Sequence, residues 1–455
     1  MIYCSGNHIA IDFAARQNAQ LVATVVVQGI LTHSVGTDLI VQVVAGGGTG
    51  GSHISDGLPL LDRLSHRGGP SAHVGVQGGL SVTVADHHIV AVRAVIGGGN
   101  HHNILGVIRA LGERKINFEL ITYGSTTKHY VSSSKYVTKH IAFAEPDDII
   151  SYLLERHPDS NEKDVIISCA DVITEILNLN YSLLSDSYIV PGFKKPELAQ
   201  TLMDKSTMIN MARICGINSP TIWKLPADLA TVNYPCITKS NLSSHGGKES
   251  VVILESREQL DEFIEKQSND VFAQEYIHKK EEVQFIGLSL NGGDEVIIPG
   301  MTRIIRSQPN TNTGFLEYGA IDSFYKDIVN KSKRFIESCG YSGLFSIEFI
   351  RDYNDNVFFL EVNFRNDGNA WCVTKAGINL PVIWVKACQG EYYQDEIKEP
   401  NHILMMPEFQ DFKLVIQRKI SLFKWIKDWW NTDYFMEYDN QDKRPFFQYI
   451  IDKIK

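Results

Sequence analysis

Two glutamates and an asparagine lie at a spacing that could ligate a metal ion. Glu348 lies in YSGLFSIEFIRD, Glu361 and Asn363 lie in NVFFLEVNFRND, and the turn-forming residues 352–356 join the two apolar segments. A hairpin places paired strands about 5 Å apart, so the two glutamates are expected to face each other. Glu361 and Asn363 share one face because side chains alternate along a strand. Three oxygen ligands suit Mg²⁺, which binds proteins through one or two carboxylates and keeps contacts to water and substrate phosphates.

The alternative is a pair of half-exposed acids on an ordinary hairpin, and the rest of the chain decides between the two. With 455 residues the chain is long enough for two or three domains. A net charge of −10 and the lack of a basic stripe argue against nucleic-acid binding. The chain contains no run of eighteen apolar residues, so no transmembrane segment is predicted. The first residues lack the pattern of a secretory signal. Seven scattered cysteines predict reduced thiols in a cytoplasmic protein.

The N-terminal part of the chain differs in composition from the rest. The first glutamate is Glu113 and the first lysine is Lys115, whereas Gly, Val, Ala and His are abundant before them. We place the boundary near Val92. The composition favours a misplaced start or out-of-frame coding slightly over a small β-rich domain, and residues 1–92 are assigned no function.

From Ala91 the pattern becomes regular. A strand candidate at 91–99 runs into a glycine turn, and a helix candidate at 103–116 and a second strand follow, which together predict a βαβ unit. The second strand does not end in the acidic residue that a nicotinamide site requires, so that interpretation is weak. The strand at 164–171 ends at Asp171, which is expected to cap the next helix, with a crevice role as the alternative.

Two lysines and a loop of small residues follow. Lys205 lies in a helix candidate at 198–215, and Lys239 ends a short strand candidate. The loop 240–249 contains Gly246 and Gly247, and its backbone N–H groups could cradle phosphates together with nearby lysines. Taken alone, this loop is equally compatible with a plain hairpin turn.

The order of these parts resembles the ATP-grasp superfamily, most closely its carboxylate–amine ligases of the D-aspartate ligase and D-alanine–D-alanine ligase kind. The resemblance rests on the glycine-turn βαβ unit and then on DKSTMINMARICGINSP, CITKSNLSSHGG, QEYI and the pair IEF and LEVNFR. It covers roughly residues 93 to 395. Each motif alone is loose, whereas all of them in this order, with the metal-ligand spacing, are specific.

The resemblance implies roles in binding ATP. The two lysines would contact the α- and β-phosphates, and the glycine-rich loop would close over them. A linker strand would recognise adenine, chiefly through the backbone of Glu275 and Ile277, and a glutamate would hold the ribose, with Glu281 as the alternative one position earlier. The implied ATP-binding residues are Lys205, Lys239, Gly246, Gly247, Gln274, Glu275, Ile277 and Glu282.

The resemblance also implies the metal and catalytic residues. Glu348, Glu361 and Asn363 would hold two Mg²⁺ ions, with Mn²⁺ as a substitute. Arg365 would stabilise the transferred phosphoryl group, and Arg303 is a weaker candidate for a second such contact.

The implied fold class is α/β, with an α+β nucleotide-binding part: an ATP-grasp fold preceded by a Rossmann-like domain. The aromatic and basic stretch ISLFKWIKDWWNTDYF is expected to pack on the catalytic body, with contact to a membrane surface as the alternative. The expected divisions are the atypical segment 1–92, a Rossmann-like domain 93–195, a lid 196–273, a metal-binding subdomain 274–395 and a helical tail 396–455.

The implied function is an ATP- and Mg²⁺-dependent ligase that joins a small-molecule carboxylate to an amine, without a nucleic-acid partner and with a homodimer left open. A carboxylate is a poor acyl donor, and phosphorylation by ATP turns it into an acyl phosphate that an amine attacks. Such phosphoryl transfer needs positioning and charge neutralisation more than a nucleophilic side chain. The alternatives are a nucleotide-binding sensor and a carboxylase-like or kinase-like ATP-grasp enzyme.

Overall fold

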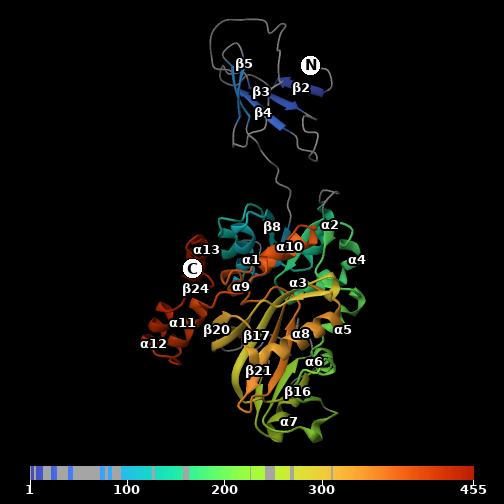
Figure 1. The fold of residues 1–455 in the computed structure, drawn as a ribbon, viewed down its shortest axis with the longest axis vertical. Helices are drawn as coiled ribbons and strands as arrows, with labels where there is room; N and C mark the ends of the chain where they lie inside the picture. The colour runs from blue at the N-terminus through green and yellow to red at the C-terminus, as the bar shows by residue number, and fades with distance from the viewer. Residues whose placement is uncertain are drawn as a thin grey trace. The chain divides into compact units, whose positions relative to one another are not determined.

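The structure is a computed structural model whose chain divides into two compact units, Met1–Ala91 and Val92–Lys455 (Figure 1). It describes residues 94–454 except 126–128, 157–162, 226, 241–251, 267–270 and 309–310, together with six strands before residue 94. These six form an antiparallel sheet in the order β1-β2-β3-β4-β6-β5. Their bounds are β1 Ile2–Cys4, β2 Asn7–Phe13, β3 Val22–Val27, β4 Leu39–Val44, β5 Ala72–Val76 and β6 Leu80–Val84.

The second unit begins with a parallel five-stranded sheet in the order β11-β10-β7-β8-β9. The apolar run after Ala91 forms its buried central strand, and the following glycines make the predicted turn into a helix. A Cβ atom on Gly98 would lie 2.9 Å from the Cβ of Cys169, so this turn requires glycine. The elements are β7 Ala94–Gly98, α1 His102–Glu113, β8 Phe118–Thr122, β9 His140–Ala142, α2 Asp148–Glu155, β10 Asp164–Ser168, α3 Asp171–Leu179, α4 Tyr181–Leu184 and β11 Tyr188–Ile189.

A smaller antiparallel sheet in the order β13-β16-β14-β15 lies within the residues predicted to form a lid and is called the lid below (Figure 1). The single helix predicted before it is wrong, because the chain forms two helices. Asp204 separates them, and its carboxylate accepts a hydrogen bond from the N–H of Thr207 and so caps the second helix. The elements are β12 Gly192–Phe193, α5 Ala199–Leu202, α6 Lys205–Ile214, β13 Ile222–Lys224, β14 Cys236–Ser240, β15 Val252–Leu254, α7 Arg257–Lys266 and β16 Val271–Glu275.

A nine-stranded sheet carries the predicted metal ligands. Its main path is β12-β21-β17-β19-β20-β23-β24, with β22 paired to β21 and β18 to β17. Phenylalanines of β17, β21 and β22, including the fully buried Phe285, Phe349 and Phe359, pack together beneath one of its faces. The elements are β17 Lys279–Leu290, β18 Glu295–Ile297, β19 Met301–Gln308, β20 Thr311–Gly319, α8 Lys326–Cys339, β21 Tyr341–Asp352 and β22 Val357–Asn363.

The C-terminal residues return to both sheets. Buried Arg109 of α1 donates to the carboxylate of Asp442, at 3.3 Å, and to three backbone carbonyls nearby, so the tail is fixed to the first sheet's helix layer. Among the described residues, no helix is both long and apolar enough to cross a bilayer. The elements are α9 Trp371–Lys375, α10 Leu380–Cys388, β23 Ile403–Met406, α11 Glu408–Ile416, α12 Leu422–Trp430, β24 Tyr434–Phe435 and α13 Arg444–Ile454.

A pair of buried acids lies within this tail. Glu408 accepts hydrogen bonds from the N–H groups of Met436, Glu437 and Tyr438, and Glu437 accepts one from Gln410. Burial raises the pKa of both carboxyls, and the neighbouring charge of Glu437 raises that of Glu408 further. At least one carboxyl is therefore expected to hold a proton well above the ordinary value of 4.5.

We expect Glu437→Gln to make stability less dependent on pH. An acid whose pKa is higher in the folded chain contributes stability that is complete below its unfolded pKa and is lost as the pH rises through its folded pKa. Above pH 4.5 the wild type should therefore lose stability relative to the variant. Denaturant midpoints measured over a pH series test this, with the exposed Glu155→Gln as control. Parallel pH curves for Glu437→Gln and wild type would contradict it.

Candidate functional site

The predicted hairpin is present and brings the two glutamates together. Strands β21 and β22 pair so that Glu348 lies opposite Glu361 and Ser346 lies opposite Asn363. A bulge follows the Glu348 position, because Phe349 pairs with Phe359. Glu348 is buried, with only 3 % of its surface exposed, so this carboxylate lies within the protein and not on an open hairpin face.

The row of polar side chains continues onto β17 with a residue that sequence reasoning missed. Gln284 lies opposite Glu348, and cross-strand partners share one face of a sheet. The Gln284 side chain is buried, accepts a hydrogen bond from Asn369 at 3.0 Å, and leaves its own N–H₂ without a partner among the described residues. The period-two spacing from Glu282 would have placed Gln284 on this face once the strand register was known.

The same strand register places the two candidate ribose ligands on opposite faces of the sheet. It also shows that one residue predicted to contact the phosphoryl group does not lie on the metal face. Glu282 shares the face of Glu348 because it lies two residues from Gln284, whereas Glu281 lies on the opposite face. Arg303 pairs with Val283 and therefore also lies on that opposite face. There its guanidinium forms ion pairs with three carboxylates, which are those of Glu281, Glu317 and Asp322. The structure thus does not bring Arg303 to the predicted metal face, and we leave it out of the proposed site.

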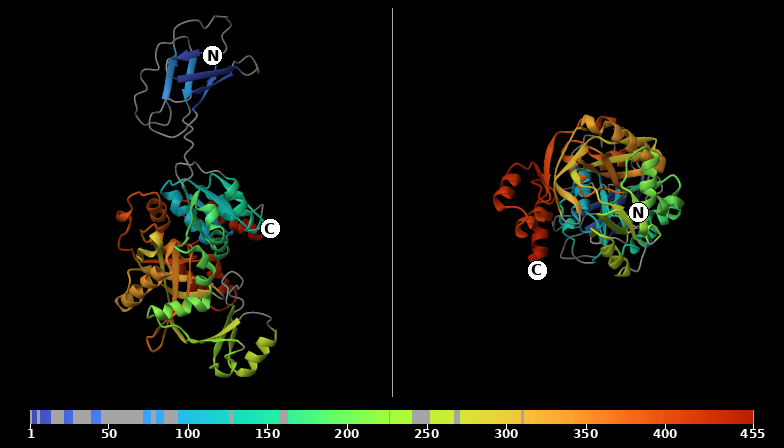
Figure 2. Two further views of the ribbon diagram at one scale, coloured as in Figure 1. Left: turned by 90° about the vertical axis from the view of Figure 1, so that its right-hand side faces the viewer. Right: turned by 90° about the horizontal axis from the view of Figure 1, so that it is seen from below.

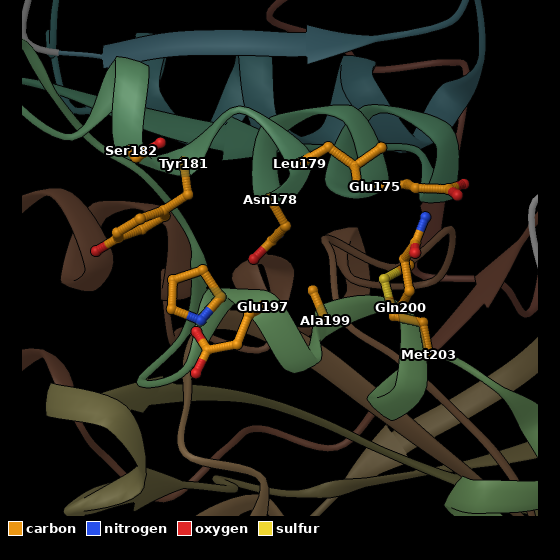
Figure 3. Close-up of a pocket in the computed structure, with 10 residues that line it drawn as sticks. Glu175, Asn178, Leu179, Tyr181, Ser182, Glu197, Ala199, Gln200 and Met203 are labelled. Carbon is orange, nitrogen blue, oxygen red and sulfur yellow. The ribbon is translucent and has the colours of Figure 1, made fainter.

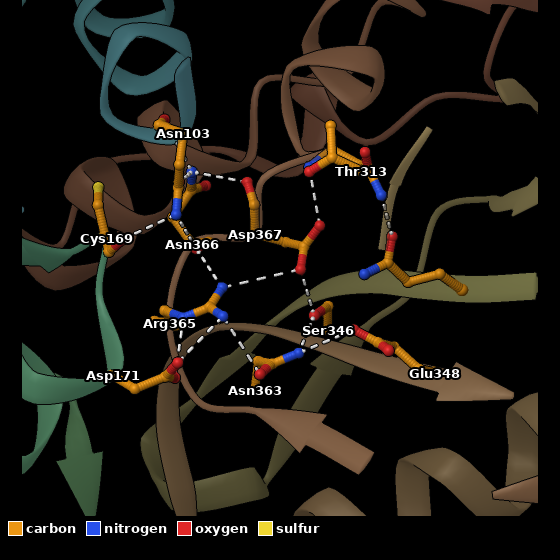
Figure 4. A network of polar contacts seen from close by, with 12 residues as sticks. Asn103, Cys169, Asp171, Thr313, Ser346, Glu348, Asn363, Arg365, Asn366 and Asp367 are labelled. Atoms are coloured by element: carbon orange, nitrogen blue, oxygen red, sulfur yellow. Dashed lines mark hydrogen bonds and ion pairs between the residues drawn. The ribbon is translucent and has the colours of Figure 1, made fainter. Parts of the chain in front are cut away.

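Arg365 lies at the end of this face and joins it to the first sheet (Figure 4). Its Nε and Nη2 donate to the two oxygens of Asp171 at 2.8 and 3.2 Å, and Nη2 also donates to Oδ1 of Asn363 at 3.3 Å. Asn363 in turn donates to Glu348 at 3.1 Å. Burial disfavours the charge on Arg365, but the carboxylates of Asp171 and Asp367 raise its pKa above the ordinary value, so the guanidinium stays charged.

The prediction that Asp171 caps helix α3 is wrong. Ala170 occupies the N-cap position, and the side chain of Asp171 turns to Arg365. A bidentate arginine–carboxylate pair with two charged partners is stronger than a hydrogen bond to one backbone N–H. The partner is 194 residues away in sequence, so a local capping rule could not find it.

The loop after β22 is fastened to the end of β10 and to the start of α1 (Figure 4). The side chain of Asn103 donates to the carbonyls of Cys169, at 2.7 Å, and Asn366, at 2.9 Å. Asn366 donates back to the amide oxygen of Asn103, and its backbone N–H donates to Ser168. The metal face therefore adjoins the carboxyl ends of the parallel strands, where ligands bind in open α/β sheets.

Two histidines at the start of α1 are further candidates that the sequence analysis did not name. His102 is buried, and burial lowers its pKa to about 4. The pKa of His101 is also lowered, by desolvation of its ring and by the nearby positive charge of Arg365. Both rings are therefore neutral at pH 7 and can donate or accept a hydrogen bond without adding charge to the crevice.

The predicted ATP contacts are only partly described. Lys205 is the first residue of α6 and is half-buried, and Lys239 lies in β14 opposite Phe272, although its side chain is outside the described part. Gly246 and Gly247 lie outside the described residues as well. The linker 276–278 runs from β16 of the lid to β17 of the large sheet, next to Glu275. We propose these roles from the resemblance and from this placement.

Gln274 lies near the end of β16, next to the linker, and its side-chain amide is buried. It is 1 % exposed, and neither its amide oxygen nor its amide nitrogen has a hydrogen-bond partner among the described residues. A buried polar group without a partner costs about 1–3 kcal/mol. A side chain kept at that cost beside the linker fits a ligand that supplies both a donor and an acceptor, as adenine does.

We therefore expect Gln274→Leu to move stability and ligand binding in opposite directions. The ligand-free protein should become more stable by about 1 kcal/mol, because an unpartnered amide is removed. The Kd for MgATP should rise about tenfold, because two hydrogen bonds to the ligand are lost. Denaturant unfolding and calorimetry measure the two effects. Gln308→Leu is the control, because that buried glutamine bonds Asp411 and its loss should destabilise the protein without weakening MgATP.

The residues of the metal face fit a hard divalent cation. Two carboxylates that face each other on adjacent strands repel unless a cation or a proton lies near them. Glu348, Glu361 and the amide oxygen of Asn363 supply oxygen donors only, which Mg²⁺ prefers. Within the described ranges no cluster of three or more His, Cys, Asp or Glu could hold a metal, so the set depends on the asparagine and on the ligands that substrate phosphates bring.

A separate cavity of about 420 Å³ opens between α3, α4 and α5 (Figure 3). Glu175, Asn178 and Tyr181 line one side, and Glu197 and Gln200 line the other. None of the residues predicted for the site lines it.

Comparisons with known proteins agree with the fold and with the arrangement of residues described above. A family model described as "ATP-grasp in the biosynthetic pathway with Ter operon" matches residues 319–412, which include β21, β22 and the loop that carries Arg365. The chain has the ATP-grasp fold. The predicted superfamily and fold class are thereby confirmed.

The relatives of this chain are distant in sequence. A formate-dependent phosphoribosylglycinamide formyltransferase of Sulfurisphaera tokodaii is 23 % identical over 309 residues, which cover 65 % of this chain and 75 % of the relative. The structure of N5-carboxyaminoimidazole synthetase from Staphylococcus aureus with ADP matches with a TM-score of 0.54 at 17 % identity, over 72 % of this chain and 86 % of the other. An L-amino acid ligase from Bacillus licheniformis matches with a TM-score of 0.51 at 15 % identity, over 67 % and 77 %.

Proposed function

We propose that this ATP-grasp protein is an ATP- and Mg²⁺-dependent ligase that joins a carboxylate to an amine through an acyl phosphate. The observation that carries the proposal is the continuous polar face from Gln284 through Glu348 and Asn363 to Arg365, which ends at the crevice of the first sheet. In this proposal the charge-neutralising groups would lie beside the bound carboxylate, as transfer of a phosphoryl group to it requires. The relatives named as ligases and synthetases support the same reaction class.

The chain's own residues would bind the parts of the nucleotide and the metal ions as follows. The linker beside Gln274 would hold the nucleotide base, Glu282 the ribose, and Lys205 and Lys239 the phosphates. Two Mg²⁺ ions on Glu348, Glu361 and Asn363, with Mn²⁺ as a substitute, would supply charge neutralisation when bound.

Arg365 would then stabilise the negative charge of the phosphoryl group in transit. Asp171 holds this guanidinium just beyond the carboxyl end of β10, so the charge would need little rearrangement when substrate binds. The carboxylate attacks the γ-phosphorus of ATP and ADP leaves. The amine then attacks the acyl carbon and phosphate leaves, giving the amide.

Hydroxylamine provides a direct test. The full chain is incubated with MgATP, hydroxylamine and a panel of carboxylates that includes amino acids, formate and bicarbonate, and both ADP and hydroxamate are measured. A hydroxamate formed with one carboxylate, in amounts equal to ADP, is the expected result. MgATP binding without carboxylate-dependent ADP would favour the sensor alternative, and a stable phosphorylated product would favour a kinase-like reaction.

A further inference from the structure

Helix α12 lies at one side of the second unit (Figures 1 and 2). It presents a strip of large apolar side chains to solvent. The exposed fractions are 87 % for Phe423, 79 % for Trp430, 49 % for Leu422, 46 % for Ile426 and 40 % for Trp429. At 3.6 residues per turn these five side chains fall within about a third of the helix circumference. Helix α12 contributes no buried residue, and it meets the catalytic body, as predicted, through its other side.

The opposite side of α12 fixes it to the protein. The ring of Trp425 packs edge-on against Phe412 of α11, with centroids 5.0 Å apart. Asp428 accepts a hydrogen bond from Arg306 at 2.6 Å, and Arg306 also pairs with the buried Asp411. These contacts prevent the helix from rolling to cover its apolar strip, which is held facing outward.

The surroundings of the strip are basic in an otherwise acidic chain. Between residues 413 and 430 there are five basic residues and one acid, Asp428, which Arg306 already neutralises, whereas the whole chain carries −10. All five basic side chains are exposed, and none forms an ion pair with another residue of the described part. They are Lys413, Arg418, Lys419, Lys424 and Lys427.

We propose that this strip and its basic border form a docking surface for anionic phospholipid membranes. An amphipathic helix with aromatic residues on one side and lysines beside them lies in the headgroup region, with its apolar side in the acyl boundary. Tryptophan suits this depth because its ring is apolar and its N–H is polar. Lys427 borders the strip on α12 and Lys424 lies further round the helix, about 100° beyond the edge of the strip. Both side chains are long enough to extend toward the membrane and place their charges among lipid phosphates.

A second copy of this chain fits the surface less well. A twofold dimer through α12 would bring the same basic border against itself, and like charges across an interface cost affinity. An anionic lipid surface complements both the strip and the border. It also repels the acidic remainder of the chain, so the protein would approach with this face first.

Vesicle sedimentation with the full chain tests the proposal. Vesicles of phosphatidylcholine mixed with phosphatidylglycerol are compared with vesicles of phosphatidylcholine alone, at low and high salt. Binding to the anionic vesicles that weakens with salt is expected, and Lys424→Gln with Lys427→Gln should lower the partition coefficient about thirtyfold. Phe423→Ser with Trp430→Ser should abolish binding.

Matched controls keep the test specific. Ile214→Ser with Tyr392→Ser removes two exposed apolar side chains elsewhere and should bind as wild type does. Circular dichroism and ligand-free unfolding should be unchanged in every variant, because all the altered side chains are exposed. Failure of the wild type to bind anionic vesicles would overturn the proposal, as would full binding by Phe423→Ser with Trp430→Ser. Strip-dependent dimers in sedimentation velocity, without vesicle binding, would instead assign the surface to a second copy.

Discussion

Glu361→Gln is expected to lower the rate of ATP-dependent turnover by at least about a thousandfold while the fold stays intact. The substitution keeps the shape of the side chain and removes the negative charge that faces Glu348 across the hairpin. With one carboxylate fewer, the face binds Mg²⁺ weakly and the transferred charge is not neutralised. Carboxylate-dependent ADP release measures the loss, and Glu155→Gln serves as the exposed control.

The same variant also tests a second prediction, which concerns the stability of the fold with and without Mg²⁺. Without Mg²⁺ it should unfold at the same or a higher denaturant concentration than wild type, because two facing carboxylates repel. Added Mg²⁺ should raise the midpoint of the wild type and leave that of the variant unchanged. Wild-type ADP release by Glu361→Gln, or an equal Mg²⁺ effect on both proteins, would show that the metal lies elsewhere.

Arg365→Lys is expected to lower kcat about a hundredfold or more, with the KM for ATP changed only a few-fold. Lysine keeps the positive charge but lacks the planar fork that bonds both oxygens of Asp171. The charge would then no longer be held where the phosphoryl group is transferred, and a group that acts mainly in the transition state affects kcat more than KM.

Asp171→Asn separates positioning from charge. It leaves Arg365 in place but loosens it, so we expect a smaller loss, about tenfold, in kcat. The two substitutions share one interaction, so their effects should not add in the double variant. Additive effects would mean that Asp171 acts on something other than Arg365. A fully active Arg365→Lys would remove this residue from the proposed mechanism.

Sequence reasoning succeeded where the determining contacts are local. The facing of Glu348 and Glu361 follows from a short turn and from strand alternation, and the helix after Gly98 follows from its apolar period. The superfamily was recognisable because several such local motifs occur in a fixed order.

Sequence reasoning failed where the strand register, or a partner distant in sequence, determines which residues come together. Arg303 and Gln284 lie on opposite faces of the sheet, and only the pairing of β17 with β19 and β21 shows which of them meets Glu348. Asp171 looked like a helix cap because its true partner, Arg365, is far away in the chain. The exposure of α12 depends on which of its sides Arg306 captures, and the helical period alone does not say this.

The paired asparagines Asn103 and Asn366 bear on how such an enzyme would gain its rate. They lock the loop that carries Arg365 to the first helix of the other sheet, within one unit of the chain. Two halves of a reaction centre that are joined in this way lose their relative freedom when the chain folds, and not again at each turnover. Any closing motion is then left to the lid, whose travel would set the access of solvent and the pace of product release without disturbing the aligned groups beneath it.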